Sequence, residues 1–284
     1  MRTGIFFYYQ TGERLRDFPE ALAGLLEKEN VFLYDAYYLS KPPSAFEFDP
    51  IPTDMLYQIH SRELVKKVKG TGEFDGALLS ASGTVRAAEK IWTGEIDNAF
   101  VFVGYGDHHA GTNFFGGGCY FNGAALSIRN LQANFGVKRF AIIDTDAHHG
   151  DGTWQIFESN PDVLYVCYCT HSVSDVNNKM NIRVPSRLSD QEYLTFVKNT
   201  FVHRVVAFQP DIIFWNWGYD CTQGEYGDMG LTPYFHTSLA KEIKSVADKI
   251  CNGRLITVLC GGARRDLATY LCPSIIKVLA GGDD

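Results

Sequence analysis

The chain has 284 residues, of which 45% are hydrophobic and 21% charged, and its formal net charge is -7 at pH 7. This is the composition of a globular protein rather than of a disordered segment. The acidic charge and the lack of a long Lys/Arg run exclude nucleic-acid binding through phosphate neutralisation. No stretch approaches the ~20 apolar residues of a membrane span, and the N-terminal apolar run is too short for a signal peptide, so we expect no membrane partner.

Short apolar runs alternate with amphipathic segments along the chain. In chain order, the pattern predicts a strand at 4–9, helices at 18–30 and 75–95, a strand at 99–103, a helix at 122–136, strands at 138–143 and 162–169, a helix at 190–208, a strand at 211–217, a helix at 234–251 and a strand at 254–260. Such alternation indicates an α/β fold with a mostly parallel central sheet flanked by helices on both faces. No repeat or linker divides the chain, so we expect a single domain over residues 1–284, with an ordered Pro-rich loop at 41–52 and a frayed tail at 281–284.

The seven cysteines are spaced irregularly, and no CxxC pair occurs, which excludes a zinc ribbon or a thioredoxin-type motif. We expect free, buried thiols in a reducing compartment, and therefore a cytoplasmic protein. Cys167 and Cys169 form a CxC inside a predicted strand, which puts both side chains on the same face.

Polar residues cluster directly after four of the predicted strands, where ligands bind in parallel α/β sheets. The segment after strand 99–103 reads GYGDHHAG, and the segment after strand 138–143 reads DTDAHHGDG. The strands at 211–217 and 254–260 are followed by GYDCTQGEYGDMG and GGARRD. Four of the eight histidines lie in the first two of these loops. The sequence therefore predicts a site at this edge of the sheet.

The segment DTDAHHGDG has the donors of a metal site. Asp146 and His148 are two residues apart and point the same way in an extended segment. A carboxylate with an imidazole suits Zn²⁺ or another divalent transition metal. We expect the third ligand from another strand end and assign it to Asp228, which leaves one coordination position for water, as in catalytic sites. A helix N-terminus at Asp151 is the alternative interpretation, but it does not explain Asp146 and His148.

His108 and His109 form a tandem pair in a Gly-rich loop. Two adjacent histidines are rarely buried, because each imidazole needs its own partners. A solvated loop is the alternative. We favour acid–base catalysis, in which one histidine takes a proton from water and the other donates one to a leaving group. Asp144 and Asp151 are available to orient the two imidazoles.

These motifs resemble the histone deacetylase family, which includes acetylpolyamine amidohydrolases and acetoin-utilisation proteins. The similarity covers most of the chain, and three segments carry it: HHAGTNFFGGGCYFNGAA, IDTDAHHGDGTWQIF and GYDCTQGEYGDMGLT. The resemblance implies an arginase/deacetylase-like fold and amide hydrolysis with one Zn²⁺ per chain, or Fe²⁺, Co²⁺ or Mn²⁺ in its place. Position by position, it implies the metal ligands Asp146, His148 and Asp228, the catalytic histidines His108 and His109, their carboxylate partners Asp144 and Asp151, and the tunnel-wall residues Gly118 and Cys119.

Three departures from the family pattern affect the substrate side. The family's GGGY or EGGY motif carries a tyrosine that binds the substrate carbonyl, whereas CGGARRD has Ala263 or Arg264 at that place. Losing such a donor typically costs about 10²–10³ in rate, and Arg264, Arg265 or Tyr105 could substitute. Gly118 replaces a wall phenylalanine. The longer GEYGD segment also makes Glu225 a competitor of Asp228 for the metal.

The function that we expect is a metal-dependent, deacetylase-like amidohydrolase. A compact chain without basic patches favours a small acylated amine over a histone as substrate. A non-catalytic, metal-binding member of the family is the alternative, because the tyrosine is missing. A ureohydrolase, which uses two adjacent metals, is a more distant one. The substrate, the native metal and the formation of a homo-oligomer stay open.

Overall fold

The computed structural model describes residues 1–7, 18–35 and 45–282. Three sequence predictions lie partly outside these residues: positions 8–9 of the first strand, 41–44 of the Pro-rich loop and 283–284 of the tail. No helix in the described part of the chain is long and apolar enough to cross a membrane.

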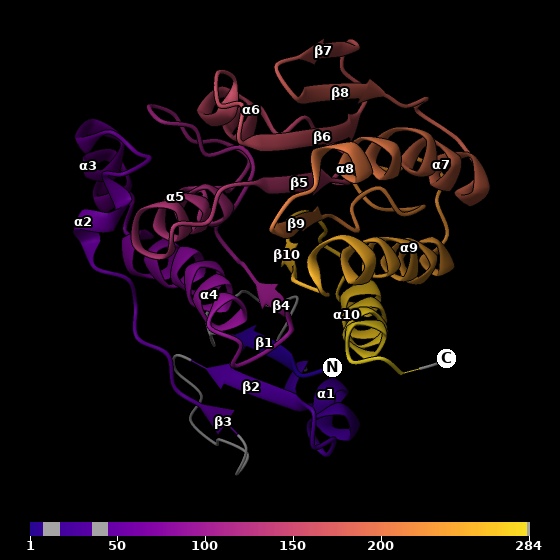
Figure 1. Ribbon diagram of the computed structural model, residues 1–284, viewed down its shortest axis with the longest axis horizontal. Helices are drawn as coiled ribbons and strands as arrows, with labels where there is room; N and C mark the ends of the chain where they lie inside the picture. The colour runs from indigo at the N-terminus through magenta and orange to yellow at the C-terminus, as the bar shows by residue number, and fades with distance from the viewer. Residues whose placement is uncertain (8–17, 36–44, 283–284) are drawn as a thin grey trace.

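A twisted sheet forms the middle layer of the molecule (Figure 1). Its ten described strands are arranged in the order β3-β2-β1-β4-β10-β9-β5-β6-β8-β7. All neighbours are parallel except β7 and β8, which form an antiparallel hairpin at one edge. The strands are β1 Thr3–Phe7, β2 Val31–Asp35, β3 Ala45–Phe46, β4 Asn98–Phe102, β5 Phe140–Asp144, β6 Val163–Cys169, β7 Ser174–Val176, β8 Lys179–Arg183, β9 Ile212–Trp217 and β10 Leu255–Leu259.

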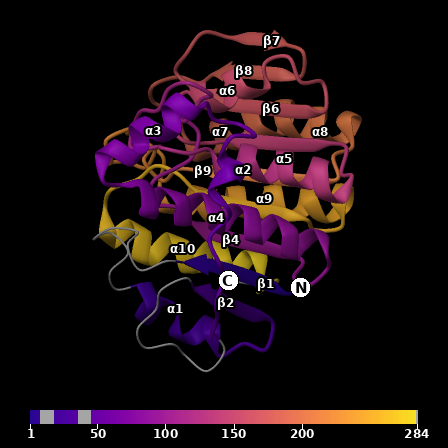
Figure 2. The same cartoon turned by 90° about the vertical axis from the view of Figure 1, so that its left-hand side faces the viewer.

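Helices cover both faces of the sheet (Figures 1 and 2). Figure 2 shows the first layer in front of the strands, comprising α2 Thr53–Leu56, α3 Arg62–Thr71, α4 Phe74–Trp92, α5 Gly123–Phe135 and α6 Asp151–Phe157. The second layer comprises α1 Phe18–Leu26, α7 Asp190–Val197, the π-helical turn η2 Lys198–Val202, α8 His203–Phe208, α9 Pro233–Cys251 and α10 Arg265–Leu279.

Each central strand contributes to two cores, because successive side chains point to opposite faces. In β5, Phe140 and Ile142 pack under the α4–α5 layer, whereas Ala141 and Ile143 pack under the α9–α10 layer. All five residues of β5 are buried. This double burial is why the central strands appear in the sequence as continuous apolar runs rather than as alternating ones.

The predicted fold class, a mostly parallel α/β sheet flanked by helices, is confirmed. The extent of the domain, residues 1–284, stays a prediction. Several described elements were not predicted, α3, α10 and β2 among them. The helix α3 is strongly charged and buries only Leu64, Val65 and Val68, and α10 contains Pro273, which normally interrupts a helix.

The carboxyl ends of β4, β10, β9 and β5 lie side by side in the middle of the sheet. Leu259 at the end of β10 is in register with Trp217 at the end of β9, and Asn216 is in register with Asp144 at the end of β5. The four polar loops that follow these strands therefore meet at one edge, as the sequence predicts.

Candidate metal and catalytic site

Three ligand-type side chains meet beyond the ends of β5 and β9. His148 Nδ1 lies 3.0 Å from Asp146 Oδ1 and 2.9 Å from Asp220 Oδ2. Both carboxylates are buried, whereas 44% of the His148 side chain is exposed. The group is therefore held from within the protein and open to solvent on its histidine side.

The structure places Asp220, and not the predicted Asp228, in this group. Asp228 lies eight residues further along the loop, where its carboxylate accepts hydrogen bonds from the backbone N–H groups of Gly224 and Gly230. Asp228 therefore stabilises the turn of its own loop. Asp220 follows the last residue of β9 by three positions, much as Asp146 follows β5 by two, so distance from the strand end was a usable signal.

A chain of buried hydrogen bonds positions the segment that carries Asp220. The indole N–H of Trp217 donates to His236 Nδ1 at 3.0 Å, so this imidazole carries its proton on Nε2. His236 Nε2 lies 2.7 Å from Thr222 Oγ1, and the Thr222 hydroxyl donates to Tyr219 O. Burial lowers the pKa of His236 to about 3, which keeps the ring neutral. The end of β9 and the turn beyond it are thus fixed to α9.

The surroundings of the two carboxylates fit a divalent cation. Asp220 Oδ2 is buried without a hydrogen-bond partner among the described residues, although it lies 2.9 Å from His148 Nδ1. Burial, and then the charge of Asp146, raise the pKa of Asp220 well above its usual range. A Cβ at Gly218 or Gly261 would collide with the carboxylates, so both glycines leave room for them. Two carboxylates and an imidazole are a ligand set for Zn²⁺ and related metals.

His108 lies beneath this group and is almost completely buried. Its Nδ1 is 3.0 Å from Asp144 Oδ2, and its Nε2 is 3.6 Å from Asp146 Oδ1. Asp144 also accepts a 2.8 Å hydrogen bond from the Tyr165 hydroxyl. Burial lowers the pKa of His108, but the nearby carboxylates, Asp144 first, outweigh it and raise the pKa to about 10.

His109 lies at the rim, where 22% of its side chain is exposed. Its Nδ1 lies 2.7 Å from Asp151 Oδ1, in the first turn of α6. The ring centroid of His109 is 4.1 Å from that of His108 and 6.1 Å from that of His148. The structure therefore forms both predicted histidine–carboxylate pairs, each with the imidazole facing the ligand group; their catalytic roles stay predictions.

The loop that carries the two histidines is tied to the first helical layer. Asp107 accepts hydrogen bonds from Gly123 N and from Ala124 N at the start of α5. Buried His60 bridges the same region, with Nδ1 2.9 Å from Gly111 O and Nε2 accepting from Asn122 N at 3.0 Å. These contacts hold the loop by several buried hydrogen bonds, which limits the freedom of His108 and His109.

Two residues predicted to replace the missing tyrosine are engaged elsewhere. The ring of Tyr105 packs on α4, where a Cβ at Gly76 would collide with it, and its hydroxyl is hydrogen-bonded to Glu73. The guanidinium of Arg264 pairs with Asp266 in the first turn of α10. Neither side chain reaches the ligand group in this arrangement.

A different tyrosine, Tyr226, lies against the ligand group. Its ring stacks on His148 with centroids 5.5 Å apart and planes 27° apart. Its hydroxyl accepts a 2.9 Å hydrogen bond from Gly262 N, in the loop where the family tyrosine is missing. Glu225 accepts hydrogen bonds from the N–H groups of Ala263 and Arg264 and thereby caps α10. It was predicted to compete for the metal, but it is not part of the ligand group. Sequence reasoning missed Tyr226 because it belongs to another loop.

The predicted wall residues lie in a tight turn beside His109. Cys119 N donates to Gly116 O, and Gly118 is exposed with a φ of 77°. A Cβ at Gly117 would collide with the His109 ring, which shows how closely this turn approaches the two histidines. Cys119 is buried beneath the turn. Substrate contact by Gly118 and Cys119 stays a prediction.

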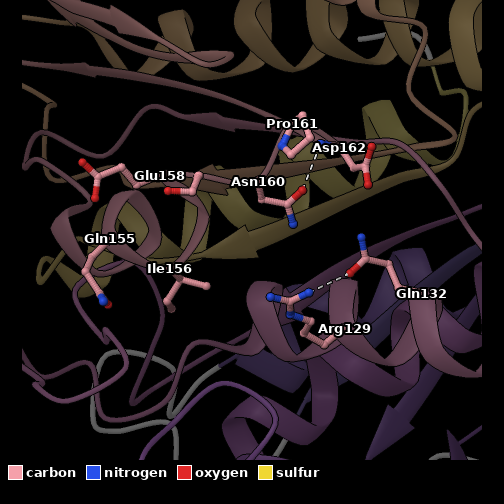
Figure 3. Close-up of a pocket in the computed structure, with 9 residues that line it drawn as sticks. Arg129, Gln132, Gln155, Ile156, Glu158, Asn160, Pro161 and Asp162 are labelled. Carbon is pink, nitrogen blue, oxygen red and sulfur yellow. Dashed lines mark hydrogen bonds between the residues drawn. The ribbon is translucent and has the colours of Figure 1, made fainter.

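An open surface pocket of about 440 Å³ lies away from this site (Figure 3). Figure 3 shows Arg129 and Gln132 of α5 on one side and the turn between α6 and β6, including Asn160 and Asp162, on the other. Its lining includes none of the predicted catalytic or metal-binding residues. We therefore place the functional site at the carboxyl ends of the strands.

Comparison with known proteins points to one family. The family model described as histone deacetylase domain matches residues 65–279. A probable deacetylase from Archaeoglobus fulgidus is 29% identical over 320 residues, covering 100% of this chain and 88% of that protein. Histone deacetylase 5 of Arabidopsis thaliana is 29% identical over 231 residues, covering 73% of this chain and 34% of that protein. Histone deacetylase HDA1 of Candida albicans is 29% identical over 252 residues, covering 78% of this chain and 30% of that protein.

A solved structure shares the fold. The crystal structure of the HDA15 HD domain superposes with a TM-score of 0.83 and 23% sequence identity, covering 99% of this chain and 90% of that one. At this identity the likeness speaks for the fold alone. The family model, by contrast, matches most of the sequence. The chain belongs to the histone deacetylase family.

Proposed function

We propose that the chain is a metal-dependent amidohydrolase that removes an acyl group, most simply acetyl, from a small amine. The family supports a deacetylase in general. The observation that carries the proposal is the convergence of Asp146, His148 and Asp220 beside two histidine–carboxylate pairs. A hydrolase of an amide needs a polarised carbonyl, an activated water and a proton donor for the amine, and this site has side chains for each task.

We propose Zn²⁺ as the resident ion, with Fe²⁺, Co²⁺ or Mn²⁺ as alternatives. When bound by Asp146, His148 and Asp220, the ion would polarise the substrate carbonyl and lower the pKa of water toward ~7. Three protein ligands leave a position open, which is the catalytic pattern. The exposure of His148 supports entry of substrate from that side.

His109 is proposed as the general base. Asp151 holds its Nδ1, so the opposite nitrogen is left to take a proton from the attacking water. His108 is a poorer base, because its carboxylate neighbours raise its pKa to about 10 and keep it protonated. Two of those carboxylates, Asp146 and Asp220, are proposed metal ligands. A bound dication would therefore lower the pKa of His108 and leave Asp144 as its remaining carboxylate partner. His108 or the protonated His109 then donates to the leaving amine.

Tyr226 is proposed to replace the missing family tyrosine. A phenol can accept one hydrogen bond and donate another. Here the oxygen accepts from Gly262 N while the ring stacks on the ligand His148, which holds the hydroxyl beside the site. We propose that its O–H donates to the substrate carbonyl as negative charge develops there. This assignment argues against the non-catalytic alternative, which was considered because the family's tyrosine donor is missing.

We propose a small acylated amine as substrate. The formal net charge of -7 supports a neutral or cationic substrate and gives no support to a nucleic acid partner. Several relatives are named histone deacetylases, so an acetylated lysine in a protein is the competing substrate. We also propose a reducing, cytoplasmic location, which the seven free and buried cysteines support.

The test is hydrolysis by purified protein that has been stripped with a chelator and reloaded with Zn²⁺. We expect turnover of N-acetylated diamines or polyamines to vanish on stripping and to return on reloading, with acetyl-lysine peptides hydrolysed more slowly. Faster turnover of the peptides would reverse the substrate assignment. Zn²⁺ binding without turnover of any acylated amine in the panel would support the non-catalytic alternative instead.

A further inference from the structure

A second group of ligand-type side chains lies near the catalytic loop. His149 Nδ1 lies 3.7 Å from Cys167 Sγ and 3.7 Å from Cys169 Sγ. The three atoms all lie within 4.8 Å of one another. Both cysteines belong to β6, and His149 belongs to the segment between β5 and α6. We call these three residues the thiol group.

The spacing within the thiol group is that of a tetrahedral metal site. In such sites Zn–S distances are about 2.3 Å and Zn–N distances about 2.1 Å, so sulfur and nitrogen ligands lie roughly 3.6 Å apart. The two observed separations of 3.7 Å agree with this value. The two thiols lie on the same face of β6, because they are two residues apart in a strand.

The surroundings favour a bound ion rather than solvated side chains. Both cysteines are completely buried, and His149 is half-buried beside Trp154, with ring centroids 5.7 Å apart. His171 stacks on His149 with ring centroids 4.9 Å apart and is exposed, so a further imidazole lies next to the group. Thiolate and imidazole are the donors that Zn²⁺ and other thiophilic metals prefer.

We propose that His149, Cys167 and Cys169 bind a thiophilic metal ion of the zinc class, with His171 completing the coordination. Four protein ligands are the pattern of a structural ion. Such an ion would join the end of β6 to the segment that carries His148, whose carbonyl oxygen lies 4.0 Å from Cys167 Sγ. The site is separate from the proposed catalytic ion, since no residue is shared between the two groups.

Metal content of the reduced full chain tests the proposal. After loading with Zn²⁺ and dialysis, we expect two ions per chain in the wild type and one in the double variant Cys167→Ser/Cys169→Ser. The variant Asp220→Asn should lose the other ion and retain that of the thiol group. The control is Cys251→Ser, a buried cysteine of α9 whose thiol bonds to a backbone carbonyl, and it should retain both ions. Unchanged zinc content in the double variant would overturn the proposal.

Cobalt gives a second measurement that does not depend on how the double variant folds. Co²⁺ bound to Asp220→Asn protein should show the near-ultraviolet sulfur-to-cobalt charge-transfer band of thiolate ligands. The melting temperature of that variant should rise by about 5 °C when free Zn²⁺ is roughly 100-fold above Kd. A missing charge-transfer band with both thiols titrating as reduced would sink the idea. So would a Cys167–Cys169 disulfide that persists under reducing conditions.

Discussion

His148 and His149 are neighbours in the sequence but belong to two chemically different groups. His148 contacts two carboxylates, Asp146 and Asp220, and His149 contacts two thiols. The two strands beside β5 supply the different donors. The strand β9 is followed by Asp220, and β6 ends in the two cysteines. One strand end in a parallel sheet can thus present adjacent histidines to two sites, with the neighbouring strands setting the chemistry of each.

The two groups both bury their acidic donors, and they differ in the exposure of the adjacent histidines. Asp146 and Asp220 are buried, as are both thiols, whereas His148 is 44% exposed and His149 is half-buried. An open position suits an ion that must meet a substrate, and a closed set of protein ligands suits an ion that holds the fold. We therefore propose a chemical role for the carboxylate group, which has three protein ligands, and a structural role for the thiol group, for which four are proposed.

The strongest way to break this comparison is to remove one carboxylate ligand. We expect Asp220→Asn to reduce kcat/KM by about 10³-fold or more, because a bound ion contributes several kcal/mol of transition-state stabilisation. Steady-state hydrolysis of an acetylated amine measures the loss. Asp228→Asn is the matched control from the same loop and should stay within about twofold, since its role is a local turn. Equal losses in both variants would restore Asp228 as a ligand.

The assignment of Tyr226 is tested by removing one oxygen atom. Tyr226→Phe retains the ring that stacks on His148 and should lower kcat by about 10²–10³-fold, as expected for an oxyanion donor. Zinc content should not change. Tyr105→Phe is the control, because that hydroxyl is engaged with Glu73, and its kcat should stay near the wild-type value. Loss of zinc from Tyr226→Phe, or an unchanged kcat, would show that the hydroxyl has another role.

A smaller effect is expected from Tyr165, which shares a face of β6 with the two cysteines. Its hydroxyl donates to Asp144, the partner of His108. Tyr165→Phe should lower kcat about 10-fold, the scale of contacts that orient functional side chains. The pH profile of kcat should shift as well, because Asp144 loses a donor to its charged form. A thiol-group ion that remains bound in this variant would show that β6 serves the two sites independently.

The smallest predicted effect concerns stability in mild acid. His236 has a pKa of about 6.5 when unfolded, and burial lowers it to about 3 in the folded chain. The unfolded chain therefore binds more protons below pH 6.5, and the stabilisation from neutral His236 is lost progressively from there toward pH 3. The slope is at most ~1.4 kcal/mol per pH unit.

Chemical denaturation of chelated protein between pH 5 and 7 measures this slope. The quantity to follow is the free energy of unfolding of wild type minus that of His236→Gln, in which contributions from other titrating groups cancel. This difference should fall as the pH falls, because only the wild type has the buried neutral imidazole. His203→Gln, an exposed position on α8, provides the control. A difference that is flat across this range would mean that His236 is not held neutral in the folded chain.

Much of the fold could be predicted from the sequence, because a strand buried on both faces must be a continuous apolar run. The same reasoning predicts that the loops carrying His108, His109, Asp144 and Asp151 meet, whereas the family resemblance alone implied which carboxylate pairs with which histidine. The choice between Asp220 and Asp228 had one usable signal, the short distance of Asp220 from the end of β9, although both residues lie in one loop. The contact of Tyr226 with Gly262 could not be predicted either, because it joins two loops that are 36 residues apart in the sequence.

The strand β6 has a consequence for tolerance to insertions and deletions. Its side chains at every second position, Tyr165, Cys167 and Cys169, contact Asp144 or His149, which belong to the two proposed sites. Sliding the strand by a single residue would turn all three toward the opposite helical layer at once. We therefore expect a one-codon length change in β6 to disturb the proposed hydrolytic site and the proposed thiol-group ion together, whereas most single substitutions there should affect only one of them.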